Sequence, residues 1–212
     1  ESPSVREILG LDALKLLNDS RYLIFFISSI LICIPLAFYY QDANLFLNEL
    51  GMKNAAGVMT LGQISEALFI LLLPIFLNKY GIKKTLIVGM FAWSLRYVLF
   101  AFGDTGSNIW MLIFGIVLHG ICYDFFFVSG QIYTDFKAGE KYKSAAQGLI
   151  ALATYGLGML IGFRLAGRVT DQFALDPGHD WTQIWIIPAI FAAVVLVIFI
   201  LTFKNEKIEI EK

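Results

Sequence analysis

Apolar residues dominate the chain in six long stretches that are separated by short polar segments. A helix needs about 20 mainly apolar residues to cross the roughly 30 Å of hydrocarbon in a bilayer. The stretches are continuous and lack the short alternating pattern of a transmembrane strand. The pattern therefore predicts an all-α membrane protein with six transmembrane helices, at about 22–48, 55–78, 85–103, 108–136, 144–170 and 182–203.

Composition supports the membrane assignment and excludes one class of partner. Of the 212 residues, 58% are hydrophobic and 16% charged, whereas an ordinary soluble domain is about one quarter charged. The formal net charge of -1 offers no basic surface for nucleic acid, so nucleic-acid binding is excluded. Cys33 and Cys122 lie inside apolar stretches, and we expect both to be buried small apolar side chains.

Lysine and arginine are concentrated on one side of the predicted helices. The segments 49–54, 104–107 and 171–181 together hold only Lys53. By the positive-inside rule, both ends of the chain are cytoplasmic. Twelve of the 16 basic residues belong to the cytoplasmic set: Arg6, Lys15, Arg21, Lys79, Lys83, Lys84, Lys137, Lys141, Lys143, Lys204, Lys207 and Lys212. An aromatic belt is expected near the outer ends, from Trp110, Trp181 and Trp185.

The chain divides into three parts by this pattern. Residues 1–20 lack an initiating Met and a signal sequence, and their apolar stripe predicts a cytoplasmic interfacial arm that links the chain to something upstream. Residues 21–203 form the transmembrane bundle, and residues 204–212 form a solvated cytoplasmic tail. We therefore expect this chain to be a fragment of a longer protein.

Three ionisable residues fall near the middle of predicted helices: Glu66, Arg96 and Asp124. Such groups cost at least a few kcal/mol each at bilayer depth, so they indicate a functional cavity or a partner. One acid could be neutralised by Arg96 while the other binds and releases a proton. The alternative is a structural ion pair between Arg96 and at least one of the two acids.

Side-chain amides accompany these charges at helical spacing. Gln63 and Glu66 are three residues apart and share a helix face, as do Gln41 and Asn44. Together they predict two walls of a polar cavity. For Gln41 and Asn44 the alternative is interhelical hydrogen bonding or closeness to the outer surface, because Asp42 beside them suggests that this helix is near water.

The fourth predicted helix adds aromatic groups to the cavity. His119 and Tyr123 are four residues apart, Asp124 follows Tyr123, and three phenylalanines come next. Amides, carboxylates, an imidazole and aromatic faces can stack on a flat ring and hydrogen-bond hydroxyls and ring nitrogens. The pattern favours a small, flat, polyhydroxylated solute, although His119 could equally be a packed, hydrogen-bonded core histidine.

Catalysis and cofactor binding have no support in the sequence. Ser129 and His119 are ten residues apart on one predicted helix, which separates them by about 15 Å, too far for a nucleophile and its base. The two histidines lie in different segments, and no Gly-Lys-Ser or Gly-Lys-Thr phosphate loop occurs. We expect neither an enzyme nor a metal or nucleotide cofactor. The small-residue pattern from Gly158 to Gly162 predicts a close approach between helices.

Several motifs resemble one family of carriers. The basic turn KYGIKK (79–84) is generic for major facilitator transporters, whereas the segments that follow are more specific. The chain is similar to the bacterial nucleoside:proton symporters in GMFAWSLRY (89–97), AFGD (101–104), HGICYDFF (119–126), VSG (128–130) and SAAQGL (144–149).

The resemblance implies that this chain is the C-terminal six-helix half of a twelve-helix carrier. Substrate would then bind at mid-membrane, between this bundle and a missing N-terminal six-helix bundle. The family's substrate contacts map onto Gln41 and Asn44, Gln63 and Glu66, and Tyr123 and Asp124. Two positions depart from the family, because Tyr123 stands where Phe is expected and His119 where Tyr is expected.

The function predicted from these observations is secondary active import of nucleosides, coupled to inward proton flow by alternating access. Glu66 or Asp124 would be the protonatable group, and Arg96 would hold the other acid ionised. The alternatives are a major facilitator carrier for another small polar solute such as a sugar, and an inactive half-transporter fragment. We expect the protein in the bacterial inner membrane, in contact with lipid.

Overall fold

The computed structural model describes residues 11–206, and helix accounts for almost all of them. An isolated β-bridge joins Ala174 and His179. The elements in order are the 3₁₀ helix η1 (Leu11–Asn18), α2 (Ser20–Glu49), α3 (Ala55–Phe102), α4 (Ile109–Val117), α5 (His119–Cys122), the π-helix η2 (Tyr123–Val128), α6 (Ser129–Ala151), the π-helix η3 (Leu152–Gly158), α7 (Met159–Gln172) and α8 (Trp181–Thr202).

Four helical runs are long and apolar enough to cross a membrane: Ser20–Glu49, Ala55–Phe102, Ile109–Gln172 and Trp181–Thr202. Three of them begin with a side-chain cap, because Asp19, Asn54 and Asp180 accept hydrogen bonds from backbone N–H groups of the first turn. The membrane-helical character predicted from the apolar pattern is confirmed.

Glycine breaks two of these runs. Gly81 interrupts α3 with φ 77° and ψ 171°, and Gly139 interrupts α6 with φ 60° and ψ 174°. A positive φ is readily adopted by glycine and costs other residues energy. Both breaks fall inside the basic segments 79–84 and 137–143 that the sequence separates from its apolar stretches.

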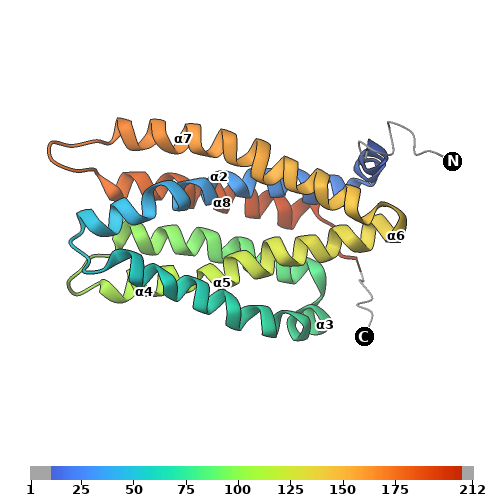
Figure 1. Ribbon diagram of the computed structural model, residues 1–212, viewed down its shortest axis with the longest axis horizontal. Coiled ribbons are helices and arrows are strands. Elements are labelled where there is room, and N and C mark those ends of the chain that lie inside the picture. Colours follow the sequence, from blue (N-terminus) through green and yellow to red (C-terminus); the bar gives the residue numbers. More distant parts are fainter. Residues whose placement is uncertain (1–10, 207–212) are drawn as a thin grey trace.

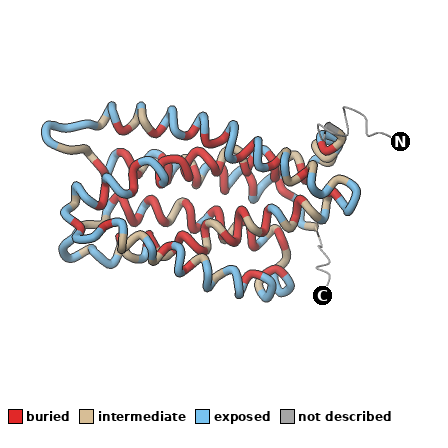
Figure 2. Tube along the Cα trace, in the orientation of Figure 1, coloured by how far each residue is buried: buried red, intermediate tan, exposed pale blue. Residues whose placement is uncertain are grey.

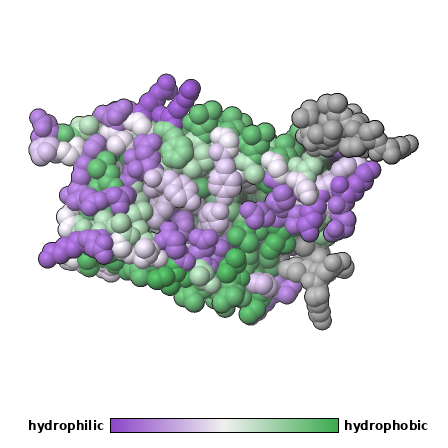
Figure 3. All heavy atoms as spheres, in the orientation of Figure 1, coloured by the Kyte–Doolittle hydropathy of each residue, from purple (hydrophilic) through white to green (hydrophobic). Residues whose placement is uncertain are grey.

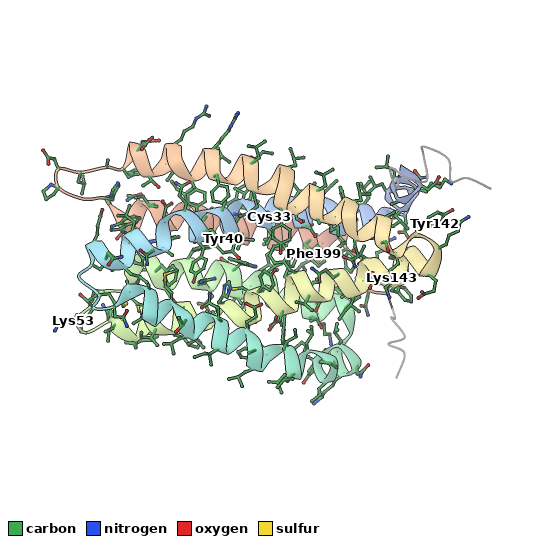
Figure 4. The ribbon with its side chains drawn as sticks, viewed as in Figure 1. Cys33, Tyr40, Lys53, Tyr142, Lys143 and Phe199 are labelled. Carbon is green, nitrogen blue, oxygen red and sulfur yellow. The ribbon has the colours of Figure 1, made fainter. Side chains whose placement is uncertain are left out.

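The helices run along the long axis of the molecule (Figure 1). Lys53, in the connection between α2 and α3, lies at one end, whereas Tyr142 and Lys143 lie at the other (Figure 4). The 3₁₀ helix η1 is at the same end as the bend of α6. Buried residues face the interior between the helices, and exposed residues cover the outside (Figure 2).

Aromatic side chains fill the part of the core near the start of α8. The rings of Tyr97 and Trp185 stack with centroids 5.5 Å apart, and Phe46 packs against Trp181 and Trp185 at 5.3 Å. Trp185 is fully buried and Trp181 nearly so, whereas Trp110 is 55% exposed. The predicted aromatic belt is therefore wrong for Trp181 and Trp185, because their rings pack between helices.

The arm and the tail are tied to the bundle where they are described. Ala13 of η1 is buried against Ala138 and Ala146, while residues 1–10 and 207–212 lie outside the described part. Lys137 donates hydrogen bonds to Asp19 and to Glu206, at 2.9 Å for the latter. Glu206 also accepts from Tyr133 at 2.9 Å and pairs with Arg21. The prediction of a merely solvated tail is wrong for Glu206.

Helix α7 approaches α2 closely through two glycines, as the small-residue pattern predicted. A methyl group at Gly158 would lie 2.7 Å from Cβ of Cys33, and one at Gly162 would lie 2.6 Å from Cβ of Ala37. Both distances are far shorter than a carbon–carbon contact, so the two backbones meet without intervening side chains.

We expect Gly162→Ala to destabilise the protein by about 1–3 kcal/mol, because the added methyl group overpacks the contact with Ala37. Gly148→Ala is the matched control, since no atom lies within 4 Å of the added carbon. Thermal unfolding in detergent measures both variants. Equal melting temperatures for the two would contradict the close contact.

We also expect Asp19→Asn to lower the melting temperature at pH 7. The hydrogen bond from Lys137 holds the pKa of the Asp19 carboxyl below its ordinary value. A lowered pKa stabilises the folded state above the unfolded-state pKa of about 4, and this contribution is lost as the pH falls through the folded-state pKa. The difference in melting temperature between the wild type and Asp19→Asn should therefore become smaller as the pH falls from 7 to 3.

Asp171→Asn is the control for this titration, because Asp171 is an exposed carboxylate in the last turn of α7. Removing a negative charge from a helix C-terminus is neutral to slightly stabilising. If the difference in melting temperature between the wild type and Asp19→Asn is unchanged at pH 3, the stabilising role assigned to the Asp19 carboxylate is refuted.

Candidate functional site

Arg96 is a fully buried charge within the bundle. Its side chain is 0% exposed, and its guanidinium carbon lies 3.5 Å from the centre of the Tyr39 ring. Trp93 and Phe100 also face it, at 5.6 and 5.5 Å. An aromatic face attracts a cation, and the attraction is strongest where water is excluded. The aromatic groups therefore offset part of the cost of burying this charge.

His119 connects Arg96 to Glu66. Nη1 of Arg96 lies 3.0 Å from Nδ1 of His119, and Nε2 of His119 lies 3.6 Å from Oε2 of Glu66. A guanidinium only donates, so Nδ1 must accept, and the ring proton of the neutral imidazole is then on Nε2. The proton faces the Glu66 carboxylate, which makes Arg96, His119 and Glu66 one polar chain.

The sequence left open a direct ion pair between Arg96 and at least one of the two acids. Within residues 11–206, Arg96 forms no such pair. Arg96 reaches Glu66 only through His119, and its Nε and Nη2 have no hydrogen-bond partner there. Asp124 is 0% exposed, and both of its carboxylate oxygens lack a partner within the described chain. The imidazole occupies the position beside the guanidinium that an acid was expected to fill.

Ser65 holds His119 in position. Its hydroxyl donates to the carbonyl of Val117 at 2.6 Å and accepts from the backbone N–H of Gly120 at 2.9 Å. These bonds bridge the junction between α4 and α5, directly beside His119. A methyl group at Gly120 would lie 2.6 Å from the Ser65 carbonyl, so α3 and α5 meet backbone to backbone at this point.

Two π-helical segments shape the neighbouring wall. Tyr123 and Asp124 open η2, and Tyr155 lies in η3. The hydroxyls of Tyr123 and Tyr155 are 2.8 Å apart and share a hydrogen bond. Single-turn π-helical insertions are rare and frequently occur at functional sites. Here the two insertions are joined by the phenol pair.

The residues with side-chain amides lie at the surface of the bundle. Gln41, Asn44 and Gln63 are exposed, and the Glu66 side chain is 34% exposed. Nδ2 of Asn44 lies 3.7 Å from the sulfur of Met59 on α3, which brings the two helices together. The structure therefore brings Arg96, His119 and Glu66 into one chain, and in residues 11–206 no hydrogen bond or ion pair links these three to Gln41 or Gln63.

Asp42 does not mark a water-facing surface, contrary to expectation. It is 2% exposed and accepts hydrogen bonds from Thr170 at 3.1 Å and from Gln41 at 3.3 Å. It therefore cross-links α2 to α7 and holds the Gln41 amide. Gln41 itself is exposed beside it.

Sequence reasoning missed Tyr39, Ser65 and Tyr155. Each is a common residue type within an apolar helix, and the sequence offers no spacing that separates such a residue from ordinary packing. For Tyr155, the neighbouring Gly156 and Gly158 were a usable signal, because glycines clear space around a large side chain.

The site lies about midway along the bundle. Tyr40 and Cys33 of α2 are near the middle of the long axis, between Lys53 and Lys143 at its two ends (Figure 4). Hydrophilic residues extend across the middle of this face between apolar areas (Figure 3). A wall with a carboxylate, amides, phenols and aromatic faces can bind a small polar ring. Membrane-length helices with charges buried at mid-depth are typical of membrane proteins that move ions or polar solutes.

The comparison with known families identifies which transporter class this is. Residues 2–208 match the family model described as "Nucleoside H+ symporter", so the chain belongs to the nucleoside:proton symporter family. This confirms the resemblance found in the motifs. The family is one of transporters, not enzymes, and the chain is a multi-pass membrane protein.

Individual relatives agree with the family assignment. The chain is 44% identical over 214 residues to YegT of Escherichia coli (strain K12), covering 97% of this chain and 50% of YegT. It is 32% identical to the nucleoside permease NupG of the same organism, covering 96% of this chain and 51% of NupG. The chain thus spans about half the length of the relatives it matches.

The fold agrees as well. A crystal structure of NupG superposes with a TM-score of 0.83 at 32% sequence identity, covering 96% of this chain and 53% of that chain. A crystal structure of a single-substitution variant of NupG gives a TM-score of 0.87 with the same coverage. The helical arrangement described above is therefore the one found in a solved nucleoside transporter.

We expect Ser65→Ala to lower the free energy of unfolding by about 1–3 kcal/mol, because it leaves the buried N–H of Gly120 without its acceptor. Ser94→Ala is the matched control, since the Ser94 hydroxyl donates to the carbonyl of Ala189 at 3.0 Å but does not serve as the acceptor of a backbone N–H within the described chain. Thermal unfolding in detergent compares the two. A smaller loss for Ser65→Ala than for Ser94→Ala would contradict the bridging role.

Proposed function

We propose that this chain is the C-terminal half of a transporter that imports nucleosides together with protons by alternating access. The observation that carries the proposal is the Arg96–His119–Glu66 chain at mid-depth, next to the unpartnered carboxyl of Asp124. Family membership and the half-length match support it. Charged groups at bilayer depth typically line substrate and proton pathways.

We propose six membrane crossings, although four continuous runs meet the length criterion. Helix α3 has 48 residues, which at 1.5 Å per residue would extend about 72 Å, more than twice the roughly 30 Å of the hydrocarbon core. Gly81 divides α3 into two parts of spanning length, and Gly139 divides the run Ile109–Gln172 likewise. The bundle then comprises residues 21–203, between the arm 1–20 and the tail 204–212.

The orientation follows from the basic residues. Lys143 lies at the end of the bundle that also holds η1, and Lys53 lies at the other (Figures 1 and 4). Basic residues are far more frequent at the first end. With six crossings, both ends of this chain are cytoplasmic in the bacterial inner membrane.

The missing partner is an N-terminal six-helix bundle. Gln41, Asn44 and Gln63 are exposed on one polar wall, and polar groups exposed to lipid are costly. A second bundle with its own polar wall would cover these amides and enclose the solute between the two halves. Apolar residues elsewhere on the surface, such as Leu71 and Leu201 at 71% and 78% exposure, would contact lipid.

The proposed binding residues divide by chemistry. Gln41, Asn44, Gln63 and Glu66 would hydrogen-bond the solute, and Tyr123 would stack on its flat ring. His119 would act mainly through Glu66, since it is 3% exposed. Asp124 is reached only from within the bundle, so its contact with solute requires movement of the wall.

Proton coupling is assigned to Glu66 and Asp124. Arg96 supplies a fixed positive charge and donates a hydrogen bond to His119, whose Nε2 lies 3.6 Å from the Glu66 carboxylate. Protonation of either acid changes the charge of the wall, which biases the balance between outward-open and inward-open states. Arg96 thus acts as the structural charge of the site, paired through an imidazole.

We expect Glu66→Gln to retain exchange of nucleosides and to lose uphill accumulation, because the amide cannot bind and release a proton. The measurement is uptake of radiolabelled uridine and adenosine into vesicles that hold the complete transporter, with and without an imposed pH gradient. Internal nucleoside in the variant should rise no higher than the external concentration. Asp124→Asn is measured in parallel.

Glu140→Gln is the matched control, since Glu140 is an exposed carboxylate beside the break at Gly139. Normal gradient-driven accumulation in both Glu66→Gln and Asp124→Asn would refute the proton-coupling assignment. Absence of uridine and adenosine uptake in the wild type would refute the nucleoside assignment. A competition panel of sugars and purines would then test for another small polar solute.

A further inference from the structure

The phenol pair formed by Tyr123 and Tyr155 has no part in the polar chain around Arg96. Its two hydroxyl oxygens are 2.8 Å apart and come from different π-helical segments, η2 and η3. Tyr155 is 42% exposed, and the Tyr123 side chain is half-buried. The pair therefore presents hydroxyl groups at the surface of the proposed substrate wall.

Neighbouring rings fix both phenols. Phe127 packs against Tyr123 with centroids 5.5 Å apart and against Tyr155 at 6.1 Å. His119 contacts the Tyr123 ring from the other side at 5.9 Å. The close approach of Gly158 to Cys33 anchors η3 against α2 three residues after Tyr155. Fixed groups lose little conformational freedom when a ligand binds.

The hydrogen-bond inventory of the pair leaves capacity for a ligand. Each phenol has one O–H donor and acceptor lone pairs. The bond between the two hydroxyls uses one donor, so one O–H and several lone pairs remain. The vicinal hydroxyls of a sugar have the same arrangement, with two adjacent oxygens that both donate and accept. The two pairs are complementary.

We propose that the Tyr123–Tyr155 hydroxyl pair binds the vicinal hydroxyls of the nucleoside sugar, with Tyr155 as a specificity-determining residue. The inference rests on the proposed nucleoside transport and adds a sugar subsite to it. Tyr155 belongs to η3, which meets α2 where Gly158 approaches Cys33, so the subsite adjoins the wall of α2.

The test compares two ligands that differ only in the sugar hydroxyls. Dissociation constants for uridine and 2′,3′-dideoxyuridine are measured on the purified complete transporter and on its Tyr155→Phe variant. Loss of a neutral hydrogen bond weakens binding by about three- to tenfold. We expect Tyr155→Phe to weaken the binding of uridine by this factor and to leave the binding of the dideoxy analogue unchanged. The ratio of the dissociation constant for 2′,3′-dideoxyuridine to that for uridine should therefore fall.

Two further variants separate recognition from structure. Tyr123→Phe keeps its ring contacts and should reduce the ratio as Tyr155→Phe does, and the double variant should reduce it no further, because the two hydroxyls act as one unit. Tyr80→Phe is the control, since it removes an exposed hydroxyl beside the break at Gly81. Thermal unfolding verifies that each variant is folded.

Each outcome decides the inference. A reduced ratio in Tyr155→Phe and Tyr123→Phe, with Tyr80→Phe unchanged, supports the sugar subsite. An unchanged ratio, or equal weakening of both ligands, overturns it, and the latter result assigns the pair a structural role. If Tyr155→Phe does not fold, the ratio in Tyr123→Phe decides. Failure of the wild type to bind uridine overturns the proposed function instead, and with it the subsite.

Discussion

A guanidinium buried at mid-depth needs compensation from the groups around it, and in this chain those groups also connect it to the partly exposed Glu66. Arg96 is covered by the ring of Tyr39 and bonded to the imidazole of His119. Because His119 must accept from Arg96, its proton faces Glu66, 3.6 Å away. The buried charge therefore determines the tautomer of the imidazole and the orientation of a group next to the exposed carboxylate.

The same imidazole joins the charge to the aromatic wall. Tyr39 stacks on His119 at 5.4 Å, and His119 contacts Tyr123 at 5.9 Å. Tyr123 in turn bonds to Tyr155 across the two π-helical segments. Glu66 is thus linked to a contiguous series of packed groups from α2, α3, α5, η2 and η3. Such a series provides a physical connection between protonation and the shape of the wall.

The sequence predicted the helical class, the breaks in the basic segments, the close approach at Gly162 and the position of Arg96 inside the bundle. It did not predict which group lies beside Arg96, because the partner depends on how each helix is rotated about its axis. In membrane proteins, lipid-facing and core-facing surfaces are both apolar, so hydrophobic periodicity carries little information about rotation. The inward packing of Trp181 and Trp185 was missed for this reason.

The π-helical segments limited prediction of the site in a second way. A turn with i→i+5 bonds shifts the following residues around the helix axis, so face assignments based on a regular α-helix fail beyond it. The segments η2 and η3 bring Tyr123 to Tyr155, although the two are 32 positions apart in the chain. No composition signal marks η2, whereas Gly156 and Gly158 lie in η3.

The open wall is the feature that connects this half to a whole transporter. Its amides and phenols are exposed, whereas Asp124 is buried directly beside Tyr123 without a partner. A buried carboxyl group without a partner is costly to keep ionised, and an exposed polar wall is costly in lipid. In the proposed transporter, a second polar bundle and a bound solute would relieve the second cost, and movement of the wall that admits a proton would relieve the first. Binding and protonation would then be coupled through the same surface, which is the physical requirement for symport.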